Sequence, residues 1–342
     1  MEAYFIFTLS ITLSLLAYKQ TKIDFFLFIP FLIAAVFAGL RYDVGIDYQS
    51  YVDNFNYILK GYPSDFEFIN KLIIELIHSV GGDVQVYFMF CAVLTNFFVY
   101  HFIKKHSQSV ITSSVLYFFI TFFFFASLNG VRQYLAIAIF LFSLRYILSK
   151  EIYKYAFIIV CASLFHTSAI LFLPLYFIIG RKYSTVELCM YGGLAFVFLV
   201  IALQYLAGML FHTSYLTQVN QTTPRALLIG FSFINIYLIF LVKNTSKEVN
   251  LFRNLLFISL VLIILVLFYP QFSMGLMRLN GYFLFALIPM LSYLPKHQKI
   301  KMRRVSIILP IITVSYLYFF YIIAFKGEQY NLVPYTLYLG WF

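Results

Sequence analysis

Long apolar stretches separated by short polar connections run through almost the whole chain. Most have the ~17–25 residues that a helix needs to cross a bilayer. A soluble domain carries about 25% charged residues, whereas this 342-residue chain carries 11%, with 63% hydrophobic residues. We expect one all-α, polytopic membrane domain over 1–342 with about 11–12 transmembrane or re-entrant helices. The stretches lie at about 3–18, 24–40, 84–103, 110–128, 132–149, 155–180, 184–211, 226–242, 251–270, 275–294 and 304–325.

Basic residues gather between these stretches in six clusters that hold seventeen of the 24 lysines and arginines. Cytoplasmic loops are enriched in such residues, so we expect all six inside and both termini outside, with the loops 41–83 and 212–225. This pattern accounts for the net charge of +11, and no nucleic-acid partner is expected. The clusters are Lys19/Lys22, Lys104/Lys105, Arg145/Lys150/Lys154, Arg181/Lys182, Lys243/Lys247/Arg253 and Lys296/Lys299/Lys301/Arg303/Arg304.

The stretch 155–180 breaks this alternation because basic clusters flank it on both sides. A single crossing would place the later clusters on the wrong side, and two full crossings would leave too few residues for each. Two short helices that meet near Phe165–Ser168, re-entrant or steeply tilted, would restore every cluster to the inside. The alternative of a single span stays open.

The loop 41–83 contains seven of the thirteen acidic residues and a predicted amphipathic helix at 66–80. At its start, RYDVGIDYQSY predicts a turn that leads into a helix from about Asp47. A carboxylate here could deprotonate a sugar hydroxyl. Equally, Asp43 or Asp47 could pair with Arg41 and cap the helix. The spacing of the two aspartates does not favour a metal site, and none is predicted.

Two further motifs place arginines near the outer ends of helices. In NGVRQYLA, Asn129, Arg132 and Gln133 have the spacing of one helix face, and a helix start beside an arginine attracts anions. In MRLNGYF, Arg278 and Tyr282 are one turn apart. Two such arginines could clamp a diphosphate, since the planar guanidinium binds phosphate bidentately. Alternatively, each anchors its helix to lipid headgroups.

His166 stands in the middle of the longest apolar stretch, followed by Thr167 and Ser168. A histidine in such a place can simply form a hydrogen bond between packed helices. Ionisable residues inside membrane segments are nevertheless candidates for function, and this one lies at the expected break.

Four segments together resemble the EpsG family, polytopic proteins of exopolysaccharide and O-antigen assembly that are akin to Wzy-type polymerases. They are FAGLRYDVGIDYQSYVDNF, NGVRQYLAIAIFLFSLRYI, YKYAFIIVCASLFHTSAI and RLNGY. The resemblance implies a GT-C-like glycosyltransferase in the bacterial inner membrane with its active site on the extracytoplasmic side. Such an enzyme transfers a growing glycan from undecaprenyl diphosphate to a hydroxyl of another lipid-linked repeat unit, and no cofactor is expected.

Laid over that resemblance, Arg132 and Arg278 would hold diphosphate, and Arg41 would help to hold one of the two lipid diphosphates or orient Asp47. The base would be Asp47 or His166. The remaining candidates would position sugars or phosphate oxygens: Asp43, Tyr48, Tyr51, Asn129, Gln133 and Tyr282. Whether a chain-length regulator takes part is left open, and two rival functions remain. One is a flippase or other transporter for lipid-linked oligosaccharide, and the other is a membrane O-acyltransferase that modifies the glycan.

Overall fold

A computed structural model describes residues 1–210, 225–241, 246–294 and 301–338. Within these residues the chain is almost entirely helical, with two strands of two residues each. The helices are α1 (Glu2–Thr21), α2 (Asp24–Gly39), α3 (Tyr48–Leu59), α4 (Phe68–Ser79), α5 (Val84–His106), α6 (Val110–Phe119), α7 (Val131–Leu148), α8 (Ile152–Phe165), α9 (Leu175–Ile179), α10 (Thr185–Leu210), α12 (Arg225–Ile236), α13 (Lys247–Phe268), α14 (Ser273–Leu284), α15 (Leu287–Tyr293) and α16 (Lys301–Lys326).

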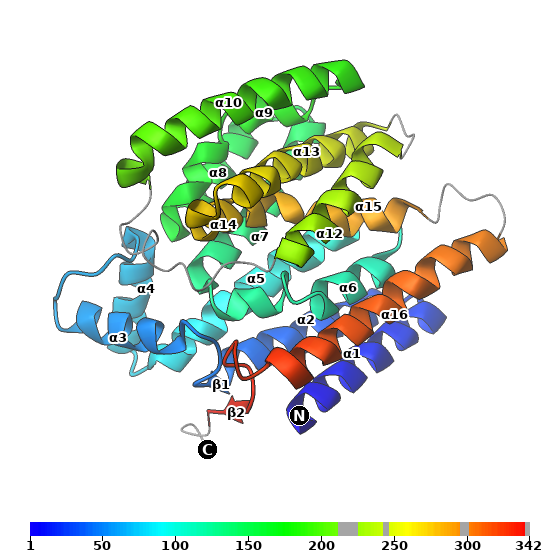
Figure 1. Ribbon diagram of the computed structural model, residues 1–342. Coiled ribbons are helices and arrows are strands. Elements are labelled where there is room, and N and C mark those ends of the chain that lie inside the picture. The colour runs from blue at the N-terminus through cyan, green and yellow to red at the C-terminus, as the bar shows by residue number, and fades with distance from the viewer. Residues whose placement is uncertain (211–224, 242–245, 295–300, 339–342) are drawn as a thin grey trace.

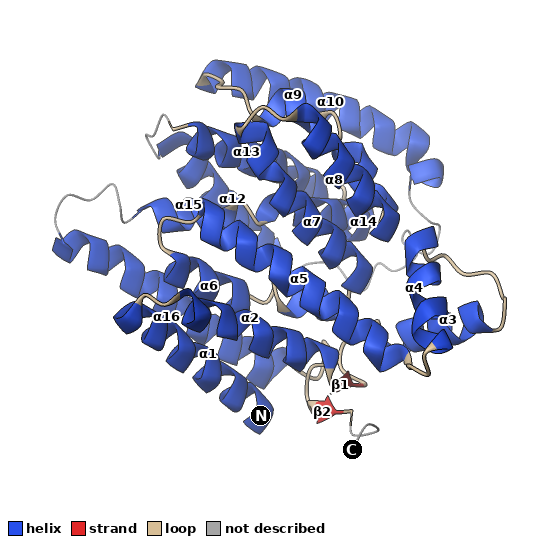
Figure 2. Ribbon diagram, turned by 180° about the vertical axis from the view of Figure 1, so that it is seen from behind, coloured by secondary structure: helices blue, strands red, loops and turns tan. Residues whose placement is uncertain are grey.

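The long helices lie side by side, while α3, α4 and the two strands gather at one end of the bundle (Figures 1 and 2). Close packing joins α2 to α5, α5 to α7 and α7 to α8. In the described residues, five helices are long and apolar enough to cross a membrane, and a bent pair is a sixth candidate. The expected all-α polytopic fold is thus confirmed. The five spans are Val84–His106, Val131–Leu148, Thr185–Leu203, Lys247–Phe268 and Val305–Lys326.

Polar residues fix where several of these helices begin. The Asp83 carboxylate accepts hydrogen bonds from two backbone N–H groups of the first turn of α5. Ser109 and Ser246 do the same for one N–H each in α6 and α13. Such caps satisfy donors that the first helical turn leaves free. At the other end of α5, Lys104 and Lys105 lie beside the negative end of the helix dipole.

Two apolar stretches do not form the single helices that their length suggests. The stretch 110–128 gives a ten-residue α6, too short to cross alone, followed by the 3₁₀ turn η1 (Phe125–Leu128). The stretch 275–294 gives α14 and α15, bent by 40°. Pro289, near the start of α15, has no N–H to continue a regular helix. Parts of the predicted layout lie outside the described residues, namely Lys243, Lys296, Lys299 and all but the last residue of the predicted loop 212–225.

The predicted break in the stretch 155–180 is present at His166. There α8 ends, the backbone is extended, and the 3₁₀ turn η2 (Thr167–Phe172) follows. The chain then returns toward the end at which α8 begins. A side chain built on Gly180 would lie only 2.8 Å from Cγ2 of Ile147, in the last turn of α7. The segment is therefore a hairpin with His166 at its tip, and the basic clusters on either side of it lie at the same end of the bundle.

The predicted helix at 66–80 is α4, but its apolar residues divide between two faces. Ile74 and Ile77 are buried, together with Asn70. Phe68 and Val80 are 73% and 77% exposed. An exposed apolar stripe of this kind is typical of helices that lie in a membrane interface.

The C-terminal segment folds back on the loop that comes after α2. Strand β1 (Arg41–Tyr42) pairs antiparallel with β2 (Thr336–Leu337), a pairing that the sequence pattern did not predict. The Gly45 N–H donates to the Asn331 carbonyl at 2.7 Å. Gly45 has φ +100°, and a side chain there would meet Asn129 Oδ1 at 2.8 Å, so glycine suits both the conformation and the space. This closure holds the loop 41–47 against the bundle.

Candidate functional site

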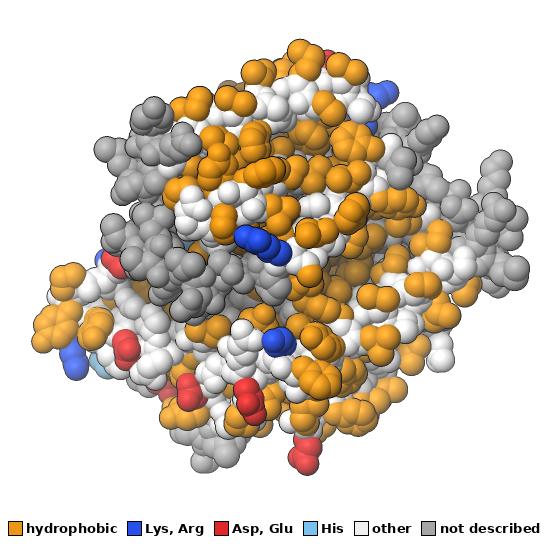
Figure 3. Space-filling view, in the orientation of Figure 1, with side chains coloured by type: hydrophobic (Ala, Val, Ile, Leu, Met, Phe, Trp, Pro, Cys, Tyr) orange, Lys and Arg blue, Asp and Glu red, His pale blue; other side chains and the backbone are white. Residues whose placement is uncertain are grey.

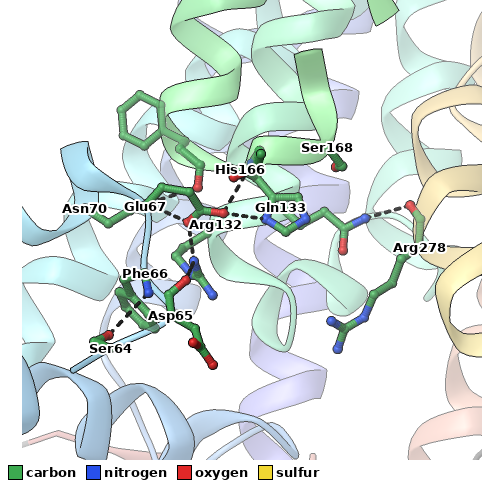
Figure 4. Close-up of polar contacts among 12 residues, drawn as sticks. Ser64, Asp65, Phe66, Glu67, Asn70, Arg132, Gln133, His166, Ser168 and Arg278 are labelled. Carbon is green, nitrogen blue, oxygen red and sulfur yellow. Dashed lines mark hydrogen bonds and ion pairs between the residues drawn. The ribbon is translucent and has the colours of Figure 1, made fainter. Parts of the chain in front are cut away.

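Glu67 lies at the centre of a polar cluster at the end of the bundle that carries α3 and α4. It precedes the first residue of α4, and its carboxylate lies between Arg132 of α7 and His166 at the hairpin tip (Figure 4). Oε1 is 3.1 Å from His166 Nδ1, and Oε2 accepts a hydrogen bond from Arg132 Nη1. The Glu67 and Arg132 side chains are only 12% and 17% exposed. The three side chains therefore form a largely buried ionic group.

Glu67 and Asn70 also provide hydrogen-bond partners for the backbone around the break at His166. The Thr167 N–H donates to Glu67 Oε1 at 3.2 Å, and Asn70 Nδ2 donates to the Phe165 carbonyl at 3.0 Å. Asn70 also accepts a hydrogen bond from the Tyr87 hydroxyl at 2.9 Å. Backbone groups freed inside a membrane segment need partners of this kind. Glu67 and Asn70 thus stabilise the conformation that presents His166.

Besides its ion pair with Glu67, Arg132 contacts Phe66 and Tyr51. Its guanidinium carbon lies 3.9 Å from the centre of the Phe66 ring, a cation–π contact. Its backbone N–H donates to the Tyr51 hydroxyl at 3.3 Å. That N–H was expected to stay open to an anion, so Tyr51 now occupies part of the helix start. The guanidinium remains the group of this residue that a phosphate could meet.

Asp47 and Arg278 lie next to this cluster, within electrostatic reach of each other. Asp47 precedes the first residue of α3, and burial raises the pKa of its carboxyl while the charge of Arg278 opposes that rise. Gln133 of α7 connects this pair to the first cluster, because its Nε2 donates to the Arg278 carbonyl at 2.6 Å. Ser168, two residues after His166, contacts the buried Tyr282 of α14, and their hydroxyl oxygens are 3.2 Å apart.

Burial alone would raise the pKa of Glu67, but the hydrogen bond with His166 and the charge of Arg132 outweigh burial and hold the pKa below its ordinary value. The pKa values of Glu67 and Asp47 are therefore shifted in opposite directions. Neighbouring carboxyls of this kind can take different roles in one site.

Arg41 belongs to the packing beneath the site. It is 1% exposed, and its side chain donates to the carbonyls of Ala38, Val44 and Leu128. Its guanidinium also lies 4.4 Å from the centre of the Phe88 ring. Burial lowers the pKa of Arg41 to about 10, so it remains charged at neutral pH.

The other residues singled out from the sequence are spread around this cluster. Tyr48 is 4% exposed, and its hydroxyl donates to Gln85 Oε1 at 3.3 Å. Asn129 precedes α7, and its Oδ1 is buried without a hydrogen bond in the described residues. Asp43 is exposed on the loop, with φ +52°. The structure therefore gathers Asp47, Tyr51, Arg132, Gln133, His166, Arg278 and Tyr282 into one region, while Asp43, Tyr48 and Asn129 border it.

Two residues that hold this site together, Glu67 and Asn70, were not among the candidates from the sequence. Glu67 stood out only as one of seven acidic residues in its loop. Its partners Arg132 and His166 are 65 and 99 positions away, so no local spacing links them. No group of three or more His, Cys, Asp or Glu residues that could bind a metal occurs in the described parts of the chain.

Acid should weaken the fold through Glu67. Because its folded pKa is depressed, its ionised form adds stability that is complete above the ordinary value of 4.5 and is lost as the pH falls through the folded pKa. We expect the melting temperature of detergent-purified protein to fall more steeply below about pH 4.5 than that of Glu67→Gln, which lacks this titration. Parallel melting curves for the two proteins would contradict the linkage.

Taken together, the fold and the site define a polytopic helical membrane protein with a buried ionic cluster at one end of its bundle. Acidic side chains gather at that end on the face in Figure 3, while hydrophobic side chains cover the helices. The chain belongs to the EpsG family, whose model matches residues 24–337, nearly the whole chain. The family comprises Wzy-type, polymerase-like proteins of polysaccharide synthesis. No curated protein and no solved structure is similar enough to match the chain.

Proposed function

We propose that the protein is a polysaccharide polymerase that works on lipid-linked glycans. It would transfer a growing chain from undecaprenyl diphosphate to a hydroxyl of another lipid-linked repeat unit. The observation that carries this proposal is the bonding of Arg132 to a carboxylate–histidine pair, with Arg278 linked to the neighbouring Gln133 through its backbone carbonyl. The arginines suit a leaving diphosphate, and the pair suits proton removal from a sugar hydroxyl. Family membership supports the same class of reaction.

Sidedness in the bundle supports an extracytoplasmic site in the inner membrane. At one end of α5, Lys104 pairs with Asp24 at 2.7 Å, beside the turn that carries Lys19 and Lys22. At the other end, Gln85 contacts the loop that contains Arg41. A helix of 23 residues separates the two ends by about 34 Å, close to the thickness of the hydrocarbon core.

The clusters Arg181/Lys182 and Lys247/Arg253 share the end that carries Lys104. Asn254 donates to the Arg181 carbonyl at 2.8 Å, and the neighbouring Arg253 donates to the Tyr183 carbonyl. His106, in the last turn of α5, lies 3.9 Å from Glu248 of α13. If this end is cytoplasmic, as its lysines and arginines favour, the Glu67 cluster faces outward.

Deletion of the gene, followed by a gel of the surface polysaccharide, tests the proposal. A polymerase predicts single repeat units without a ladder, restored by the wild-type gene but not by an Arg278→Ala variant of equal abundance. A complete absence of surface units would indicate a flippase. An unchanged ladder with altered acylation would indicate an acyltransferase, and either result would overturn the proposal.

A further inference from the structure

The contact between Glu67 and His166 indicates which group removes the proton from the acceptor hydroxyl. The proposed polymerase reaction leaves this open between Asp47 and His166, and any assignment of the base rests on that reaction. The two candidates have different surroundings. Asp47 faces Arg278, whereas the His166 ring meets a carboxylate through one nitrogen and leaves the other free.

Glu67 itself cannot serve as the base, because both of its oxygens are already engaged. Oε1 is shared by His166 Nδ1 and the Thr167 N–H, at 3.1 and 3.2 Å. Oε2 accepts from Arg132 and from Asn70 Nδ2, the latter at 3.2 Å. A carboxylate with this many donors stays ionised and acts as an acceptor.

An ionised Glu67 determines which nitrogen of His166 carries the hydrogen. An acceptor-only oxygen at 3.1 Å requires Nδ1–H as the donor. The neutral ring then has an unprotonated Nε2, and this atom makes no hydrogen bond within the described residues. The ring is 24% exposed, so Nε2 is not sealed inside the protein. The charged group in contact with the ring is Glu67, from the loop before α4, and Arg132 of α7 contacts the other oxygen of that carboxylate. The Tyr282 hydroxyl of α14 contacts Ser168 in the adjoining turn.

We infer that His166 is the catalytic base and that Glu67 is its positioning residue. Nε2 takes the proton of the acceptor hydroxyl as the hydroxyl oxygen forms a bond to the anomeric carbon of the donor sugar. The bond from that carbon to the diphosphate oxygen breaks, and its electron pair leaves with the lipid diphosphate. The proton is then released from the imidazolium to water. Arg132 keeps Glu67 ionised, which stabilises the imidazolium after proton transfer.

Asp47 has a different part in this arrangement. It lies close enough to Arg278 for that charge to act on its carboxyl. We therefore assign Asp47 to the diphosphate side of the site, where it orients Arg278. An Asp47→Asn variant then loses rate without changing the pH dependence of the remaining reaction.

The test uses the full-length protein in detergent and, as substrate, the lipid extract of the deletion strain. The variants are His166→Ala, His166→Gln, Glu67→Gln and Asp47→Asn. Glu75→Gln is the matched control for Glu67→Gln, since Glu75 is an exposed glutamate on α4, the helix that Glu67 precedes. Melting temperature and gel-filtration profile establish that each variant is folded, and polymer length is followed over pH.

We expect both His166 variants to lose about 10²–10⁴-fold in rate, and added imidazole to restore part of it in His166→Ala. Glu67→Gln is expected to lose roughly 10–10³-fold in kcat. The acidic limb of its pH–rate profile moves to lower pH because the imidazolium has lost its carboxylate partner. A purely structural role for Glu67 would leave that limb in place. Glu75→Gln keeps the wild-type rate and profile.

Three results would overturn the inference. The first is a folded His166 variant with the wild-type rate, and the second is an unmoved acidic limb in Glu67→Gln. The third is disappearance of the limb in Asp47→Asn, which would make Asp47 the base. Each of these leaves the polymerase reaction standing. If wild-type protein forms no polymer from the extract, the proposed function itself fails, and the base assignment fails with it.

Discussion

Replacement of Arg132 by alanine is expected to abolish polymer formation and to lower the melting temperature of the purified protein. The change leaves the Glu67 carboxylate buried without its cation, and removal of one partner from a buried pair costs about 3–5 kcal/mol. It also removes the guanidinium stacked on Phe66. Arg132→Lys keeps the charge but loses the planar fork, so we expect only partial recovery.

A double variant separates stability from activity. Arg132→Met combined with Glu67→Gln removes both charges, and such replacement is often nearly neutral for folding. We expect it to recover most of the melting temperature but no polymer. Arg145→Ala is the matched control, since Arg145 stacks on Phe142 at 3.7 Å near the other end of the same helix. Polymer formation by Arg132→Ala at the wild-type rate would contradict a role for Arg132 in the reaction.

Arg41→Ala should affect folding more than chemistry. It leaves three buried carbonyls without their donor, and each unsatisfied group costs about 1–3 kcal/mol. We expect little folded protein, measured as yield and melting temperature in detergent. Arg41→Lys should recover only part of the loss, because an ammonium cannot reproduce the guanidinium geometry.

The control for Arg41 is Lys60→Ala, an exposed change in the same 41–83 loop, which should leave both yield and melting temperature unchanged. An Arg41→Lys protein with the wild-type melting temperature but without polymer formation would instead support the diphosphate-binding role that the sequence suggested for Arg41.

The helical layout could be predicted because length and hydropathy act locally. A run of apolar residues long enough to cross a bilayer has few alternatives to a helix. The hairpin at His166 was also predictable, since the basic clusters around 155–180 are compatible with few paths. The end of α6 at Phe119 has no comparable marker, because the apolar sequence continues to residue 128.

The site was only partly predictable, because its contacts join distant segments. Arg132, His166 and Arg278 stand out as ionisable residues at the edge of, or within, apolar runs. Glu67 does not stand out, since six other acidic residues share its loop. Nor does the sequence reveal whether an arginine such as Arg41 faces a phosphate or three backbone carbonyls, because both surroundings satisfy the same donors.

The pairing of β1 with β2 bears on the order in which the protein is made. A chain is synthesised and inserted from its N-terminus, but residues 41–42 find their strand partners only at 336–337. The Gly45 N–H likewise can donate to the Asn331 carbonyl only after that residue has been synthesised. Contacts this far apart in the chain form late, because the intervening loop must first be closed. A nascent chain therefore has most of its helices before strand β1 has its partner, and the loop 41–47 is closed only after residues 331–337 have been made.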